Sequence, residues 1–229
     1  MTTARIYPVI HILNEQQVIR NIEIANDANA HGVFLINHNI PVDDLIRLSM
    51  TAKGLTSWVG INCLGYSALE AMKVVPPWVD GLWVDNAEIN VDEERRRAAG
   101  QSQALKIREE QKQRSWLGTY FGGVAFKYQK SVDDVAKAAK VASEYMDVVT
   151  TSGPGTGKAA NIDKIKKMWE AMLPGSRLAI ASGITPENIE LYLPYATDFL
   201  VATGISTDFY NLDSTKLHFL MAATYDCGN

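Results

Sequence analysis

The sequence predicts an α/β fold, a single (β/α)8 TIM barrel of the phosphate-binding type. Short apolar runs, typical of buried parallel strands, alternate with helical patterns along the 229 residues, and about eight such units fit. A third observation is a set of three glycine-bearing turns in the last third of the chain, which predicts an anion site. A doubly wound open sheet is the competing architecture, but no Gly-x-Gly-x-x-Gly turn follows the first expected strand.

The expected strands are near-continuous apolar runs, which suits strands that are buried on both faces. The fifth run has a possible extension to Phe126. The runs are Ile6–Leu13, Val33–Asn37, Trp58–Cys63, Gly81–Asp85, Trp116–Phe121, Asp147–Thr151, Leu178–Ser182 and Phe199–Thr203.

The expected helices lie between these runs, and two have recognisable starts. Asn161 with Asp163 can begin the sixth, and Thr185 can cap the seventh with Pro186 in its first turn. The helices are Glu15–Ala30, Val42–Lys53, Ser67–Val75, Asp92–Gln113, Ser131–Tyr145, Ile162–Leu173, Pro186–Leu193 and Thr215–Tyr225.

The bulk properties fit a soluble protein, with 47% hydrophobic and 21% charged residues. A net charge of -4 argues against a nucleic-acid partner, and we expect no membrane partner because no apolar run reaches a membrane-spanning length. Without a signal-peptide pattern or a linker, we expect one cytoplasmic domain over residues 1–229. Cys63 and Cys227 read as free thiols, and the scattered Asp, Glu and His residues predict no metal site.

Candidate site residues stand where the strands end, because the active site of such a barrel lies at the carboxyl ends of its strands. The turns after the last three strands supply a phosphate rim of backbone N–H groups, hydroxyls and one lysine. In the alternative interpretation, the glycines merely allow tight turns. The predicted substrate and phosphate contacts are Ser152, Gly153, Thr156, Lys158, Ser182, Gly183, Thr203, Gly204, Asn62 and Asn37.

Three residues of the ring are the candidate catalytic groups. Asp85 suits a general base or a ligand of ribose hydroxyls, or a carboxylate that anchors its loop. Lys127 suits an anion contact, or a base or Schiff-base nucleophile if its pKa is lowered, although a surface lysine is equally simple. His11 suits an acid, a base or a metal ligand if it enters the barrel, and otherwise a core histidine; His38 is a weaker candidate.

Five segments together resemble the BtpA family, predicted barrel proteins that include a photosystem I biogenesis protein and proteins described as nucleosidases. The resemblance implies the barrel and retains His11 and Lys127, but it defines no reaction. The segments are Val9–Leu13, Val59–Leu64, Phe121–Tyr128, Val149–Lys158 and Ser182–Asn188.

The sequence departs from this family near the expected chemistry. Gly123 and Tyr128 stand where the family tends to have Asp and His around the fifth-strand lysine. His38 and Asn39 replace a Glu-Asn pair, and Asn14 leads straight into a helix where the family has a Leu-Pro-Gly-Ser loop. A family catalytic role does not carry over to these altered positions.

The first functional hypothesis is an enzyme that acts on a phosphorylated sugar or a nucleotide-like metabolite, by glycosidic-bond cleavage or transfer or by isomerase or lyase chemistry, without a cofactor. The second is a barrel without catalysis that serves as a ligand sensor or assembly factor. A flavin oxidoreductase is the third, since the same rim suits a flavin phosphate. The expected partner is a phosphorylated small molecule. A homo-oligomer is also considered, because Trp78, Trp116 and Tyr120 suit either an interface or the core.

Overall fold

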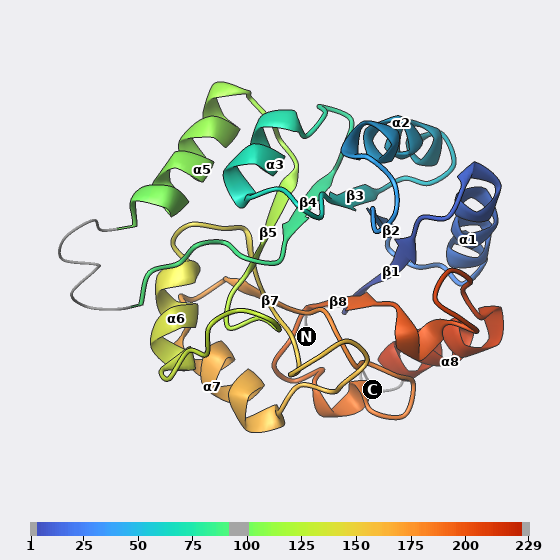
Figure 1. Ribbon diagram of the computed structural model, residues 1–229. Helices are drawn as coiled ribbons and strands as arrows, with labels where there is room; N and C mark the ends of the chain where they lie inside the picture. Colours follow the sequence, from blue (N-terminus) through green and yellow to red (C-terminus); the bar gives the residue numbers. More distant parts are fainter. Residues whose placement is uncertain (1–3, 92–100, 226–229) are drawn as a thin grey trace.

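A computed structural model of the protein describes residues 4–91 and 101–225. Eight parallel strands form a closed barrel in chain order, with helices around its outside (Figure 1). The strands are β1 Arg5–His11, β2 Val33–Ile36, β3 Val59–Asn62, β4 Gly81–Val84, β5 Thr119–Gly123, β6 Val148–Thr151, β7 Arg177–Ile180 and β8 Asp198–Val201. The predicted (β/α)8 barrel is thereby confirmed.

Side chains that alternate along the strands separate the barrel interior from the layer beneath the helices. In β1, Tyr7 and Val9 belong to the interior cluster, whereas Ile6 and Ile10 pack in the outer one. The β1–β8 pairing, which runs from Arg5 opposite Asp198 to Pro8 opposite Val201, closes the barrel. Strands that are buried on both faces account for the continuous apolar runs in the sequence.

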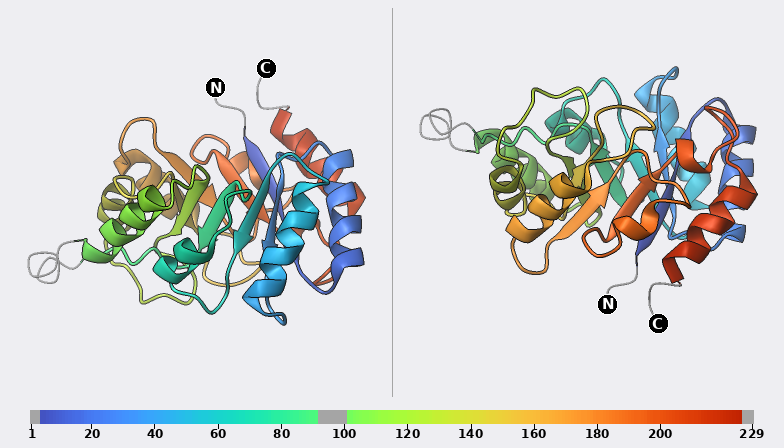
Figure 2. Two further views of the ribbon diagram at one scale, coloured as in Figure 1. Left: turned by 90° about the horizontal axis from the view of Figure 1, so that it is seen from above. Right: turned by 90° about the horizontal axis from the view of Figure 1, so that it is seen from below.

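The helices have local sequence signals that fit their positions. Ser67 and Glu70 form a complete capping box, and the Asn161 side chain accepts hydrogen bonds from the N–H groups of Asp163 and Lys164. The helices are α1 Glu15–Asp27, α2 Val42–Lys53, α3 Ala68–Val74, α5 Ser102–Gln113, α6 Val135–Ala142, α7 Ile162–Ala171 and α8 Ser214–Tyr225. Figure 2 shows that the start of β1 and the end of α8 lie on the same side of the barrel.

The prediction of a seventh α-helix over Pro186–Leu193 is wrong. Only the short 3-10 helix η1, Ile189–Leu191, forms there. The side chain of Asn188 accepts a hydrogen bond from the N–H of Thr185 and donates one to the carbonyl of Gly183, so it bonds the loop backbone in place of helix partners. A second 3-10 turn, η2, covers Thr203–Ile205 after β8.

Other expected boundaries also change. The possible extension of the fifth strand to Phe126 does not form, because Ala125 has a φ of 47°, which ends the extended backbone. Residues 92–100 of the expected fourth helix, and Cys227, lie outside the described residues. Trp116 and Tyr120 are buried, which favours the core interpretation over an interface for both.

The amino end of the barrel is filled by aromatic rings and a buried ion pair. Tyr7, Phe34 and Phe121 make edge-on ring contacts with centroids 5.2 to 5.9 Å apart. Beside them Arg177, the first residue of β7, pairs with the fully buried Asp198, the first residue of β8. These side chains fill the barrel interior at its amino end.

Candidate functional site

A pocket of about 150 Å³ opens at the carboxyl ends of the strands. Its floor consists of apolar interior side chains, and its rim comes from the loops that follow the strands. The floor is lined by Val9, Ile36, Trp83, Ala181 and Leu200, and the rim by His11, His38, Lys127, Tyr128, Thr156, Gly157, Ser182, Gly183, Ala202, Thr203 and Phe209.

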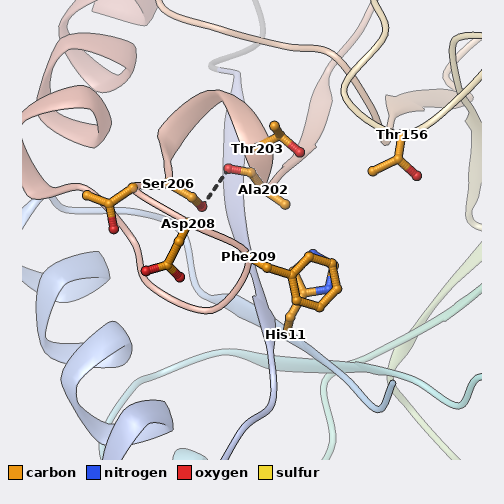
Figure 3. Close-up of a pocket in the computed structure, with 8 residues that line it drawn as sticks. His11, Thr156, Ala202, Thr203, Ser206, Asp208 and Phe209 are labelled. Carbon is orange, nitrogen blue, oxygen red and sulfur yellow. Dashed lines mark hydrogen bonds between the residues drawn. The ribbon is translucent and has the colours of Figure 1, made fainter. Parts of the chain in front are cut away.

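A second pocket of about 310 Å³ lies beside the first, over the loop that follows β8. The two share His11, Thr156, Ala202, Thr203 and Phe209, so Phe209 stands at their boundary. Figure 3 shows the Phe209 ring against His11, with Thr156 reaching in from a different loop. The two pockets therefore lie next to each other and share these five lining residues.

Backbone contacts between the last three loops require two of the predicted glycines. Gly183 has a φ of 66°, and a Cβ there would overlap the backbone of Lys158 and Ala159. A Cβ at Gly204 would overlap the carbonyl of Ile184. The positive φ of Gly183 fits the alternative interpretation of a tight turn. Packing of one loop on the next is a further reason for glycine at both positions.

The two predicted serines of the rim form hydrogen bonds that connect these loops. The Ser152 hydroxyl is fully buried and accepts a hydrogen bond from the N–H of Lys127 at 2.7 Å. The Ser182 hydroxyl accepts one from the N–H of Gly153 at 2.8 Å and donates one to the carbonyl of Lys158 at 3.2 Å. Ser182 still lines the pocket, whereas Ser152 and Gly153 do not.

Several backbone donors stay available beside the pocket. Within residues 4–91 and 101–225, the N–H groups of Gly183, Thr203 and Gly204 have no hydrogen-bond acceptor. The exposed Thr203 side chain lines both pockets, and the Thr156 hydroxyl lies 3.5 Å from that of Tyr128. Lys158 is exposed and lines neither pocket. Polar donors of this kind suit an anion.

The rings of His11, His38 and Phe209 form a cluster at the rim. The His11 ring centroid lies 4.7 Å from that of His38 and 4.2 Å from that of Phe209. Burial, followed by the charges of His38 and Lys127, lowers the pKa of His11 to about 4. Burial is also the main cause that lowers the pKa of His38. Both imidazoles are therefore mainly neutral at pH 7.

The half-buried Asp85 and the buried Asn62 form a hydrogen-bonded pair near His38. The Asn62 amide donates a hydrogen bond of 3.0 Å to an Asp85 carboxylate oxygen. Burial raises the pKa of Asp85, while the Asn62 hydrogen bond and the charges of Lys127 and His38 act in the opposite direction. Asp85, Lys127 and His38 are thus electrostatically coupled. Asp85 and Asn62 line neither pocket.

Asn37 holds two loops together and faces neither pocket. Its side chain accepts a hydrogen bond from the N–H of Leu64 at 2.8 Å and donates one to the carbonyl of Ile40 at 3.2 Å. The structure therefore gathers His11, Lys127, Thr156, Ser182, Gly183 and Thr203 around one pocket and leaves Asn37, Asn62, Asp85, Ser152, Gly153, Lys158 and Gly204 off its surface.

Lys164 lies near the site but was not among the residues predicted from the sequence. Its ammonium donates hydrogen bonds to the carbonyls of Ala125 at 2.5 Å and Ser152 at 2.8 Å, which joins the loops after β5 and β6. Burial lowers its pKa to about 8. A lysine in the first turn of a helix is unfavourable beside the helix dipole, and this is the signal that the sequence contained.

Metal ligands do not cluster in the described part of the chain, where no group of three His, Cys, Asp or Glu side chains is placed to hold an ion. In residues 4–91 and 101–225, no helix combines the length and apolar character that a membrane crossing requires.

Comparisons with solved structures confirm the barrel. No protein-family model and no curated protein matches the sequence, so membership of the BtpA family is not shown. (S)-3-O-geranylgeranylglyceryl phosphate synthase from Thermoplasma acidophilum, in complex with its substrate sn-glycerol-1-phosphate, is 13% identical with a TM-score of 0.64, over 98% of this chain and 94% of that one.

Two further barrels of known structure are also similar to this chain. Thiamine phosphate pyrophosphorylase from Pyrococcus furiosus is 12% identical with a TM-score of 0.66, over 98% of this chain and 97% of that one. Phosphoribosyl anthranilate isomerase from Thermus thermophilus is 14% identical with a TM-score of 0.53, over 97% of this chain and 99% of that one. At such identities the likeness shows the fold alone.

Proposed function

We propose that the protein is an enzyme that binds a phosphorylated small metabolite at the mouth of its barrel. The observation behind the proposal is the pair of unpaired N–H groups of Gly183 and Thr203, two residues that line the pocket together with Lys127. Gly204, the residue after Thr203, has a third unpaired N–H group. Backbone N–H groups and a lysine are suitable donors for a phosphate. The similar solved structures support this proposal. One contains sn-glycerol-1-phosphate, and the names of the other two include phosphorylated compounds.

The reacting part of the ligand would lie near His11 and Lys127, which share the pocket. A neutral His11 can accept or relay a proton, and Lys127 can stabilise negative charge that develops on the substrate. Asp85 would be the third catalytic group, since it interacts electrostatically with Lys127 and His38. These groups suit glycosidic-bond cleavage or transfer as well as isomerase or lyase chemistry on a sugar phosphate or a nucleotide-like compound.

Calorimetric titration with inorganic phosphate and with D-ribose 5-phosphate tests the binding proposal. We expect both to bind, and Thr203→Glu to weaken each by about tenfold or more through charge repulsion. Ser57→Glu is the matched control, because the exposed Ser57 precedes β3 at the other end of the barrel. Equal affinities in both variants, or no binding to the unaltered protein, would contradict the proposal.

Turnover is tested on two substrates that represent the two reaction classes. Proton NMR of D-ribose 5-phosphate reports aldose–ketose isomerisation, and that of adenosine 5′-monophosphate reports release of the base. We expect Asp85→Ala and Lys127→Met to abolish turnover of the accepted substrate. Phosphate binding should persist in Asp85→Ala and weaken in Lys127→Met, which loses a phosphate donor. Lys166→Met on the exposed face of α7 is the control. Turnover that both site variants leave unchanged would exclude the proposed catalytic roles.

A ligand sensor or assembly factor without catalysis, similar to the BtpA family, is the second candidate. It is favoured by Gly123, which replaces an Asp of that family. A Cβ at this position would overlap the backbone carbonyl of Asp85, so this backbone leaves no space for that side chain. Phosphate binding together with an absence of turnover on both substrates would support this candidate.

A further inference from the structure

Trp83 lies in the floor of the mouth pocket. It is the third residue of β4, belongs to the interior cluster and is 4% exposed. Its ring packs edge-on against Phe34 at 5.9 Å between centroids and lies 6.1 Å from Phe126. These contacts hold the indole in place at the bottom of the pocket.

The indole nitrogen of Trp83 is buried without an acceptor among the residues that the structure describes. Two other tryptophans differ in this respect: the indole N–H of Trp116 donates to the carbonyl of Val79 at 3.0 Å, and that of Trp78 to the Ser49 hydroxyl at 3.2 Å. A buried donor without a partner costs free energy, so such a group in a native protein requires an explanation.

A second unpaired polar atom belongs to the same pocket. Nδ1 of His11 is buried and has no hydrogen-bond partner in the described part of the chain. The floor around these two groups is apolar, with Val9, Ile36 and Leu200, whereas Lys127 belongs to the rim. An apolar floor with a neutral donor suits a neutral oxygen better than a charged group.

We propose that this floor is the subsite for the end of the ligand opposite its phosphate, and that the Trp83 indole N–H donates a hydrogen bond to a hydroxyl or carbonyl oxygen of that end. The inference rests on the proposed function and narrows the ligand to a phosphate ester with a neutral, oxygen-bearing carbon skeleton. Inorganic phosphate has no such end, so it would occupy the rim alone.

The test compares inorganic phosphate with D-ribose 5-phosphate on the unaltered protein and on Trp83→Phe, which keeps an apolar ring and removes the N–H. We expect a threefold to tenfold loss of affinity, roughly the value of one hydrogen bond, for D-ribose 5-phosphate only. Trp116→Phe is the matched control: it loses an indole N–H with an acceptor, so it should lower stability without changing the ratio of the two affinities.

A second measurement does not depend on the folding of a variant. In the ¹H–¹⁵N spectrum of the unaltered protein, the Trp83 indole peak should move with D-ribose 5-phosphate and stay in place with inorganic phosphate. A fixed peak, or an unchanged affinity ratio in Trp83→Phe, while phosphate still binds, overturns the subsite alone. Failure of both compounds to bind the unaltered protein overturns the proposed function and the subsite with it.

Discussion

The imidazole of His11 stacks on that of His38 with the ring centroids 4.7 Å apart and the planes inclined by 28°. Phe209 contacts both rings, at 4.2 Å from His11 and 5.1 Å from His38. Two protonated imidazoles at this separation would repel each other, and the phenyl ring removes water from them. The cluster therefore keeps the His11 imidazole at the pocket rim neutral at pH 7.

Removal of the Phe209 ring should raise the pKa of His11 from about 4 towards the ordinary value of 6.5, because burial is the main cause of its depression. An NMR titration of the imidazole signals of Phe209→Ala measures this shift. Phe219→Ala, an exposed phenylalanine on α8, is the control and should leave the pKa of His11 unchanged. An unaltered titration in Phe209→Ala would show that this ring does not bury His11.

His11 should also make the protein less stable in acid. Between pH 6.5 and pH 4 the unfolded chain binds a proton at His11 that the folded protein excludes, so the free energy of unfolding falls as pH falls through this range. The full contribution is about 3 kcal/mol, from roughly 1.4 kcal/mol for each unit of pKa. Urea unfolding at pH 7 and pH 4 should show a smaller loss for His11→Gln than for the unaltered protein. His218→Gln, exposed on α8, should behave like the unaltered protein.

Asn62 should control the protonation of Asp85. Its amide donates to the carboxylate, and this hydrogen bond opposes the effect of burial, so Asn62→Ala should raise the pKa of Asp85 further. The carbon NMR shift of the Asp85 carboxyl, followed against pH, measures the change. Asn26→Ala, an exposed asparagine on α1, provides the comparison. The same pKa in both variants would mean that the hydrogen bond does not act on the carboxylate.

The strand pattern predicted which candidate residues lie near one another, because a closed parallel barrel brings all carboxyl ends of its strands to one mouth. His11, Lys127 and Thr203 were found in this way and share the pocket. Asn37 and Ser152 occupy equivalent positions along the sequence, yet their side chains bond the backbone of neighbouring loops. The direction of a side chain beyond the strand end depends on loop contacts that no local pattern contains.

Some residues near the site were not indicated by the sequence, because their positions depend on contacts between segments that are far apart in the chain. Phe209 stands in a polar loop without periodicity, and its role follows from its contact with His11, which belongs to the first strand. The alternation in β4 places Trp83 inside the barrel, but whether its N–H meets an acceptor depends on the opposite strands. The expected seventh helix is absent because the Asn188 side chain bonds the loop backbone in place of a helical pattern.

Arg177 and Asp198 should matter for stability at the amino end of the barrel. Arg177→Met leaves a fully buried carboxylate without its main partner, for which a cost of about 3 to 5 kcal/mol in the free energy of unfolding is usual. Arg47→Met is the control, since Arg47 is 58% exposed and pairs with exposed carboxylates on α1 and α2. It should cost less than about 1 kcal/mol in the same urea experiment. Similar losses in both variants would argue against the buried pair.

Alanine substitutions at Gly183 and Gly175 distinguish two free-energy costs of replacing a glycine. One is backbone strain at a positive φ, and the other is overlap of the added Cβ with neighbouring atoms. Both have a positive φ, 66° and 84°, so alanine strains the backbone at either position by about 1 kcal/mol. A Cβ at Gly175 meets nothing within 4 Å, whereas one at Gly183 overlaps the backbone of Lys158 and Ala159. Urea unfolding should therefore show a clearly larger loss for Gly183→Ala than for Gly175→Ala. Because the loop after β6 must move, phosphate affinity should fall only in Gly183→Ala. Equal stabilities would mean that the two loops are not packed as described, and the glycine turn would then serve the ligand alone.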